Sequence, residues 1–159
     1  MRFRAALLGV LLILSAAAAR AQKAVFIVRH GEKFSEENER LTDAGKARAT
    51  RLATILKDSG IAAVYSTETE RTIGTAKPLA DLLGQKVRIY PNPSALVETL
   101  RHENAADIVL VVGHSNSVPA LLESLGCTEK ISIASDEYDN LFVVVPQKDG
   151  KPLLLRLRY

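Results

Sequence analysis

The sequence predicts an α/β fold, a three-layer α/β/α sandwich whose sheet is mainly parallel and carries an antiparallel C-terminal edge. Two observations support this prediction. Short apolar runs alternate with longer segments in which apolar residues recur every three or four positions, as in chains that alternate buried strands with amphipathic helices. The last two apolar runs flank Asp149-Gly150, a dipeptide typical of hairpins. We therefore expect parallel strands covered by helices on both faces, followed by one antiparallel pair.

Six apolar runs are the predicted strands. They are residues 24–28, 61–65, 87–89, 108–112, 141–145 and 153–157. Four amphipathic segments between them are the predicted helices, and each is long enough to cross one face of the sheet. They are residues 43–57, 70–83, 94–102 and 117–125.

The first predicted helix has clear signals at both ends, an N-cap at Thr42-Asp43 and a stop at Ser59-Gly60. Its apolar positions share one face, which we expect to pack on the sheet: Ala49, Leu52, Ala53 and Leu56. Its basic positions are expected to be solvated: Arg48, Arg51 and Lys57.

The next two predicted helices are marked by a proline and a cap. Pro78 lies inside the second helix and is expected to kink it or to interrupt its hydrogen bonding. Ser94 is the expected cap of the third helix. In the second helix the expected inward positions are Ile73, Ala76, Ala80 and Leu83, and Gly84 closes it.

The amino terminus has the pattern of a secretory signal peptide, residues 1–21. Arg2 and Arg4 precede an apolar run that is too short to span a bilayer, and Ala19-Arg20-Ala21 is a small-residue cleavage pattern. We therefore predict one domain, residues 22–159, in a protein that is periplasmic or secreted and has no stable membrane anchor after cleavage.

Charge argues against a nucleic-acid-binding protein. The three arginines of the predicted signal peptide account for the whole formal charge of +3, so the remaining chain is neutral and has no stripe of basic residues. An anionic ligand would therefore have to be held by a local site. The single cysteine, Cys127, cannot form an internal disulfide and is expected to be a small buried hydrophobe.

Basic residues follow three of the predicted strands. Arg29 and His30 come directly after the first strand, Arg71 begins the helix after the second, and His114 follows the fourth. In open α/β sheets the carboxyl ends of parallel strands form the ligand-binding edge. Two guanidiniums, two imidazoles and a helix amino end gathered there would stabilise the charge of a phosphoryl group.

These residues resemble the histidine phosphatase superfamily, also called the phosphoglycerate mutase-like family. The resemblance extends over four segments in the family's order: Arg29-His30-Gly31-Glu32, Leu41-Thr42-Asp43-Ala44-Gly45, Ser66 to Ala76, and Val112-Gly113-His114-Ser115-Asn116. It implies a phosphoric monoester hydrolase that needs no cofactor. Together with the predicted signal peptide, this gives an exported enzyme for a small phosphorylated substrate, such as a sugar phosphate, an envelope glycolipid or a phosphoprotein.

The resemblance also implies the roles of the site residues. His30 is the nucleophile that forms a phosphohistidine, and Arg29, Arg71 and His114 bind the transferring group. A neutral His30 needs a hydrogen-bond acceptor for its other ring N–H, often a backbone carbonyl. Gly31 lets the backbone turn close to the phosphate.

The residue that donates a proton to the leaving group is not identified by the resemblance. Glu98, after the third strand, is the preferred candidate, although a solvated helix face explains it equally well, and the tryptophan-glutamate-glycine typical of mutases is missing. Ser115 stands where the phytase-like branch has its acid, which disfavours that branch. Beside the nucleophile, Glu32 is expected to be structural, and Lys33 either binds an anionic substrate or is solvated.

Other functions are less well supported. The three histidines have no paired metal-ligand spacing, so no metal site is expected. An esterase with Ser115 as nucleophile would need a later histidine, and none follows His114. Two alternatives stay open: a mutase-like phosphotransferase, and a non-catalytic protein of the same fold that binds phosphorylated ligands.

Overall fold

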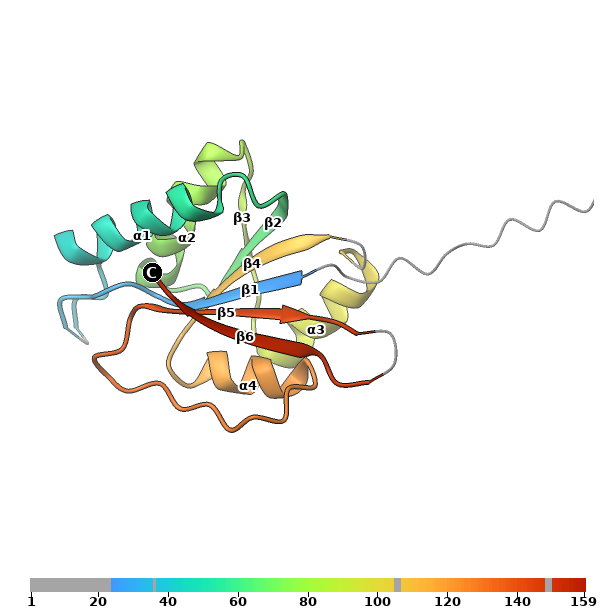
Figure 1. Cartoon of the computed structure of the whole chain (residues 1–159). Coiled ribbons are helices and arrows are strands. Elements are labelled where there is room, and N and C mark those ends of the chain that lie inside the picture. Colours follow the sequence, from blue (N-terminus) through green and yellow to red (C-terminus); the bar gives the residue numbers. More distant parts are fainter. Residues whose placement is uncertain (1–23, 36, 105–106, 148–149) are drawn as a thin grey trace, which may run out of the picture.

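The fold is built around one six-stranded mixed sheet, seen in a computed structural model that describes residues 24–35, 37–104, 107–147 and 150–159. The strand order is β3-β2-β4-β1-β5-β6 (Figure 1). The strands are β1 (Ala24–Arg29), β2 (Ile61–Ser66), β3 (Val87–Ile89), β4 (Ile108–Gly113), β5 (Asn140–Val145) and β6 (Leu153–Arg158). The first four are parallel, whereas β5 and β6 are antiparallel to their neighbours, which confirms the predicted fold class.

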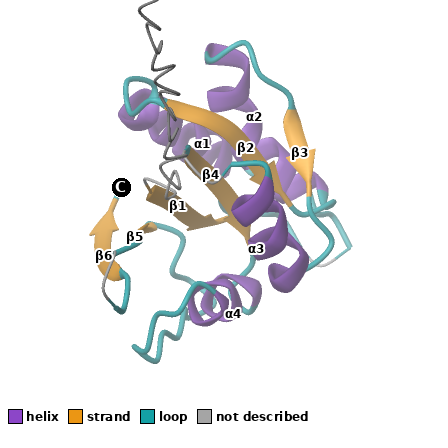
Figure 2. Cartoon of the chain, turned by 90° about the vertical axis from the view of Figure 1, so that its right-hand side faces the viewer, coloured by secondary structure: helices purple, strands orange, loops and turns teal. Residues whose placement is uncertain are grey.

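Helices cover both faces of this sheet (Figures 1 and 2). They are α1 (Asp43–Leu56), α2 (Glu70–Leu82), α3 (Pro93–His102) and α4 (Ser117–Ser124). One buried apolar cluster joins α1 and α2 to one face, and a second joins α3 and α4 to the other. Cys127 belongs to the second cluster, as expected of a small hydrophobe.

The predicted start of α1 is confirmed by its cap. The Thr42 hydroxyl accepts a hydrogen bond from the Gly45 amide at 3.1 Å, which satisfies one of the free N–H groups of the first turn. The predicted inward residues of this helix are all buried. Its length and its face were therefore readable from periodicity alone.

Three local predictions are corrected. Asn92, not Ser94, caps α3, because its side chain accepts from the Ala95 amide at 2.9 Å. Ile73 is not a core residue; Leu79 is fully buried in α2 instead, and the helix continues through Pro78. Arg48 is not on a solvated face, since its guanidinium is half-buried against Glu32.

Two predictions fall outside the described residues: the signal peptide of residues 1–21 and the position of Asp149 in the predicted hairpin turn. No helix among the described residues is long and apolar enough to cross a membrane.

The pairing of β1 with β4 positions the candidate site. Arg29 is in register with Gly113, so the residues that follow, His30 and His114, leave the sheet side by side. The segment that leads into β5 passes the same edge, at the left of Figure 1. Residues from both ends of the chain thus meet at the carboxyl ends of β1 and β4.

Candidate active site

His30 is buried at the end of β1 in a fixed orientation. Its backbone N–H donates to the Gly113 carbonyl at 2.9 Å, and its ring Nδ1 lies 2.7 Å from the Gly31 carbonyl oxygen. A carbonyl can only accept, so Nδ1 carries the proton and Nε2 keeps its lone pair. Gly31 therefore supplies the acceptor that the sequence left unnamed.

The surroundings of His30 keep the imidazole neutral. Burial is the main cause that lowers its pKa from 6.5 to about 4; the nearby charges of Arg29 and Arg71 act in the same direction, and the hydrogen bond to the Gly31 carbonyl opposes them. At neutral pH the ring is therefore an unprotonated nitrogen base, the form a nucleophile requires.

His114 is held by a chain of hydroxyl groups. Its Nε2 lies 2.9 Å from the Thr67 hydroxyl, which donates to the Thr72 hydroxyl, which in turn donates to backbone carbonyls. This order of donors makes Nε2 the protonated nitrogen of His114. Its Nδ1 faces the Arg71 guanidinium at 3.4 Å, and the two histidine rings lie 5.4 Å apart, edge to face.

Arg71 joins this pair from the first turn of α2 and is paired with Glu39. Its Nη1 donates to the Glu39 carboxylate, which comes from the loop between β1 and α1. Burial and the Arg71 charge lower the pKa of His114, whereas the Glu39 charge raises it and those of Arg29 and Lys33 lower it. These side chains therefore form one electrostatic cluster.

Two buried donors in the cluster lack an acceptor among the described residues. They are the Nε atoms of Arg29 and Arg71. A buried N–H without a partner is costly, and an oxyanion has the acceptor oxygens that such donors need. The cluster is therefore suited to binding an anion.

Arg29 also has a structural role that the sequence did not predict. Its Nη1 donates to the backbone carbonyls of Ala134, Ser135 and Glu137 at 2.8, 3.0 and 3.1 Å. Its guanidinium lies 4.1 Å above the ring of Tyr138, which is 6.0 Å from the ring of His30. Arg29 thereby fixes the segment before β5 beside His30.

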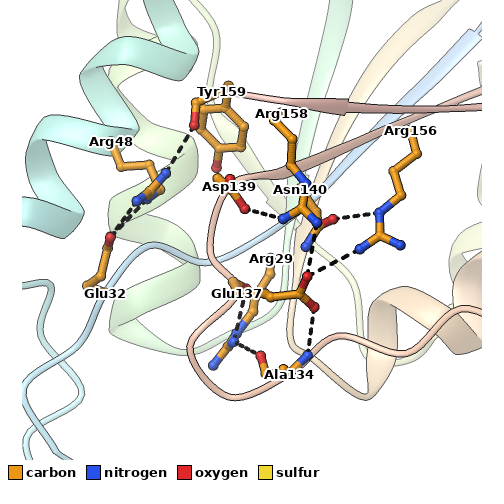
Figure 3. Close-up of polar contacts among 10 residues, drawn as sticks. All are labelled: Arg29, Glu32, Arg48, Ala134, Glu137, Asp139, Asn140, Arg156, Arg158 and Tyr159. Carbon is orange, nitrogen blue, oxygen red and sulfur yellow. Dashed lines mark hydrogen bonds and ion pairs between the residues drawn. The ribbon is translucent and has the colours of Figure 1, made fainter.

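The strand β6 holds the other side of this segment, as Figure 3 shows. Arg158 contacts the carboxylates of Asp139 and Glu137 at 2.5 and 3.0 Å, and Arg156 contacts Glu137 at 3.4 Å. The other Glu137 oxygen accepts from the Ala134 amide at 2.9 Å. The segment is therefore clamped between Arg29 and two arginines of the last strand.

The turn after His30 is fixed by close backbone packing. A Cβ on Gly31 would lie 2.9 Å from the Gly45 carbonyl oxygen, and one on Gly45 would lie 2.3 Å from the Glu32 carbonyl oxygen. The Glu32 carboxylate accepts from Arg48 Nε at 3.0 Å and Nη2 at 2.6 Å (Figure 3). Glu32 is therefore structural, as predicted, and Gly31 is needed for contact with α1.

The structure brings most of the sequence-predicted site residues into one cluster, but among the described residues it gives Glu98 no contact with that cluster. Arg29, His30, Arg71 and His114 share one cluster, and Lys33 contributes its charge to it. The contacts of Glu98 are with its own helix, at 3.0 Å from Arg101 and 3.6 Å from His102, and 61% of its side chain is exposed.

Two members of the cluster were not predicted from sequence, Glu39 and Tyr138. Glu39 lies between the first predicted strand and the first predicted helix, and Tyr138 lies just before the fifth predicted strand. The single aromatic residue within the acidic stretch Asp136 to Asn140 was the available signal for the second. Glu39 had no such signal, because three other acids lie in the same loop: Glu32, Glu36 and Glu37.

Comparison with known proteins agrees with this geometry. Residues 25–92 match the family model of the histidine phosphatase superfamily (branch 1). The chain also matches a structure of the protein histidine phosphatase SixA complexed with tungstate, at a TM-score of 0.69 and 23% identity over 85% of this chain and 96% of that one. The chain has the histidine phosphatase fold.

Two further histidine phosphatase-fold matches are phosphatases by their descriptions. A phosphoserine phosphatase from Entamoeba histolytica aligns at a TM-score of 0.66 and 15% identity, over 86% of this chain and 96% of that one. A mycobacterial glucosyl-3-phosphoglycerate phosphatase complexed with VO3 aligns at a TM-score of 0.66 and 12% identity, over 86% of this chain and 98% of that one. No curated protein sequence matches the chain.

The family match to the histidine phosphatases includes Arg29, His30 and Arg71 and ends before β4. His114 is thus placed beside them by the sheet register and not by that match.

Proposed function

We propose that this histidine phosphatase-fold protein is an exported phosphoric monoester hydrolase that works without a metal ion through a phosphohistidine on His30. One observation carries the proposal: a buried neutral imidazole whose Nδ1 proton is bound to Gly31, beside a second histidine and two arginines. A neutral Nε2 is a nucleophile, and the surrounding cations stabilise the charge of a transferring phosphoryl group.

The proposed reaction has two displacements. His30 Nε2 attacks phosphorus and the P–O bond to the alcohol breaks. Arg71 donates to the phosphoryl oxygens, His114 aligns Arg71 through its Nδ1, and Arg29 adds positive charge. Water then attacks the phosphohistidine and the P–N bond breaks, which returns neutral His30 and releases phosphate. The desolvated site strengthens each charge interaction at the moment of transfer.

Small phosphorylated compounds are the proposed substrates. The matched structures described above act on phosphoserine or glucosyl-3-phosphoglycerate by their descriptions, and one is a protein histidine phosphatase. In this chain a surface hollow of about 560 Å³ flanks the loop that carries Glu39. Its apolar wall includes Phe34, Leu41 and Ile73, which suits the organic part of a substrate. Charged residues of both signs also line it: Arg40, Lys46 and Glu70.

A phosphoprotein is the second candidate substrate. Of the three structures described above, the protein histidine phosphatase has the highest identity and TM-score. Release of phosphate from a phosphohistidine-containing protein faster than from sugar phosphates would favour this substrate; the reverse order would favour the small compounds.

The test of the reaction is turnover of p-nitrophenyl phosphate in the presence of EDTA. We expect phosphate release by the wild-type protein and loss of at least about 1,000-fold in kcat for His30→Ala. His102→Ala is the matched control, because His102 is an exposed histidine on α3 that pairs only with Glu98 among the contacts above. Equal turnover in His30→Ala would contradict the nucleophile, and no turnover in the wild type would favour a binding protein.

Two further parts of the proposal have their own measurements. Transfer of phosphate to an added alcohol in preference to water would favour the mutase-like alternative over a phosphatase. Export is proposed from the signal-peptide pattern, and a mature protein that begins at Gln22 outside the cytoplasm would support it. Lys33 is a proposed contact of an anionic substrate, and the Glu98→Gln variant described below tests Glu98 as the proton donor.

A further inference from the structure

Glu39 is the carboxylate that the fold brings into direct contact with the proposed phosphate site. Its Oε1 accepts from Arg71 Nη1, and its charge acts on His114. The side chain of Arg71 is 13% exposed and that of Glu39 is 39% exposed, so the carboxylate is the more solvent-accessible member of the pair.

A bound phosphate changes the partners of Glu39. The phosphoryl oxygens compete with the carboxylate for the Arg71 guanidinium, whose donors suit both oxyanions. The carboxylate is then displaced from Arg71 but stays beside the bound group, within the cluster that holds the reacting phosphoryl. A carboxyl group in that position is placed to give a proton to a leaving oxygen and to take one from an attacking water.

We propose that Glu39 is the general acid and base of this site, a role that rests on the phosphatase function proposed above. In the first step the Nε2–P bond forms, the P–O bond breaks, and the Glu39 proton moves to the leaving oxygen, so an alcohol departs. In the second step Glu39 takes a proton from water as the oxygen attacks phosphorus and the P–N bond breaks. Each turnover consumes one water and restores both residues.

The loop position suits this role better than that of Glu98. Glu98 is more exposed and its contacts are with Arg101 and His102 of its own helix. Glu39 lies on the loop between β1 and α1, whose base is fixed by the Lys33–Leu41 bridge and by the Phe34 amide donating to the Arg40 carbonyl. These two contacts fix the ends of the loop that carries the Glu39 carboxylate.

The test compares two substrates that differ in their need for a proton. p-Nitrophenolate leaves without protonation, whereas the alcohol of β-glycerol phosphate requires it. We expect Glu39→Gln to lower kcat/KM for β-glycerol phosphate by about 100-fold or more and that for p-nitrophenyl phosphate by less than about threefold. Glu37→Gln, an exposed residue of the same loop, should leave both values unchanged.

Other results would overturn the assignment. If Glu39→Gln lowered kcat/KM equally for both substrates, Glu39 would be a structural partner of Arg71. If the variant raised kcat/KM equally for both, Glu39 would be a competitor of phosphate. A loss selective for β-glycerol phosphate in Glu98→Gln, with Glu39→Gln unaffected, would assign the acid to Glu98. If the wild type released no phosphate from either compound, or if His30→Ala stayed active, the phosphatase proposal itself would fall, and the role of Glu39 with it.

Discussion

The neutral state of His30 predicts how stability depends on pH. In the folded protein burial lowers the pKa of His30 to about 4, while in the unfolded chain it returns to 6.5. Below pH 6.5 the unfolded chain therefore binds a proton that the folded protein does not. The unfolded state holds more protons in this window, so the free energy of unfolding falls as the pH falls.

The size of the effect follows from the two pKa values. Between pH 8 and pH 5 the His30 contribution to the free energy of unfolding falls by about 2 kcal/mol, and below pH 4 the loss reaches its limit of about 3 kcal/mol. A His30→Gln variant lacks this proton linkage. Its stability should fall by about 2 kcal/mol less than that of the wild type over the same range.

The assay is urea unfolding at pH 8, 7, 6 and 5, followed by far-ultraviolet circular dichroism, because the chain has no tryptophan. His102→Gln is the control and should follow the wild-type curve, since His102 is exposed on α3. If wild type and His30→Gln lose the same free energy between pH 8 and pH 5, His30 is not held neutral by burial and the argument for a prepared nucleophile fails.

Three further predictions concern the supports of the site. Gly45→Ala should lower the free energy of unfolding by about 2 kcal/mol, because the new Cβ would lie 2.3 Å from the Glu32 carbonyl oxygen. Gly150→Ala is the control, since its Cβ faces open space, and should change the free energy of unfolding by less than about 0.5 kcal/mol. Equal urea midpoints for the two variants would refute this prediction. Arg48→Met should cost about 2 kcal/mol in the same assay, since it leaves the half-buried Glu32 carboxylate without its guanidinium, and an unchanged midpoint would show the pair to be dispensable. Arg158→Leu should lower kcat/KM for p-nitrophenyl phosphate by about tenfold with little change in Tm, because it loosens the segment packed on Arg29; unchanged kinetics would mean that this clamp does not position the site.

Local patterns were enough to predict the sheet, the helices and the sheet edge that carries the site. Periodicity identified the buried face of α1, and the Thr42 cap located its start, because each of these signals depends on residues only three or four positions apart. The positions of His30 and His114 followed from strand ends alone. Their placement side by side needed only the parallel pairing that such a fold implies.

The missed features are contacts between distant residues. Arg48 reaches Glu32 across 16 residues, Arg71 reaches Glu39 across 32, and Arg29 reaches the Ala134 carbonyl across 105. A charged side chain on a helix or in a loop has the same local sequence whether it is solvated or paired. Only the packing of the whole chain decides which of these states it adopts.

The clamp on residues 134–139 has a consequence for how the protein is made. His30 directly follows β1, the first strand, whereas Arg156 and Arg158, which hold the neighbouring segment, lie on β6 (Figure 3). A nascent chain can pair β1 with β4 before β6 has left the ribosome, but the segment beside His30 then has no support from Arg156 or Arg158. The segment beside His30 therefore gains its second set of contacts only after β6 has been synthesised, and until then Arg29 alone, of the arginines described above, holds it.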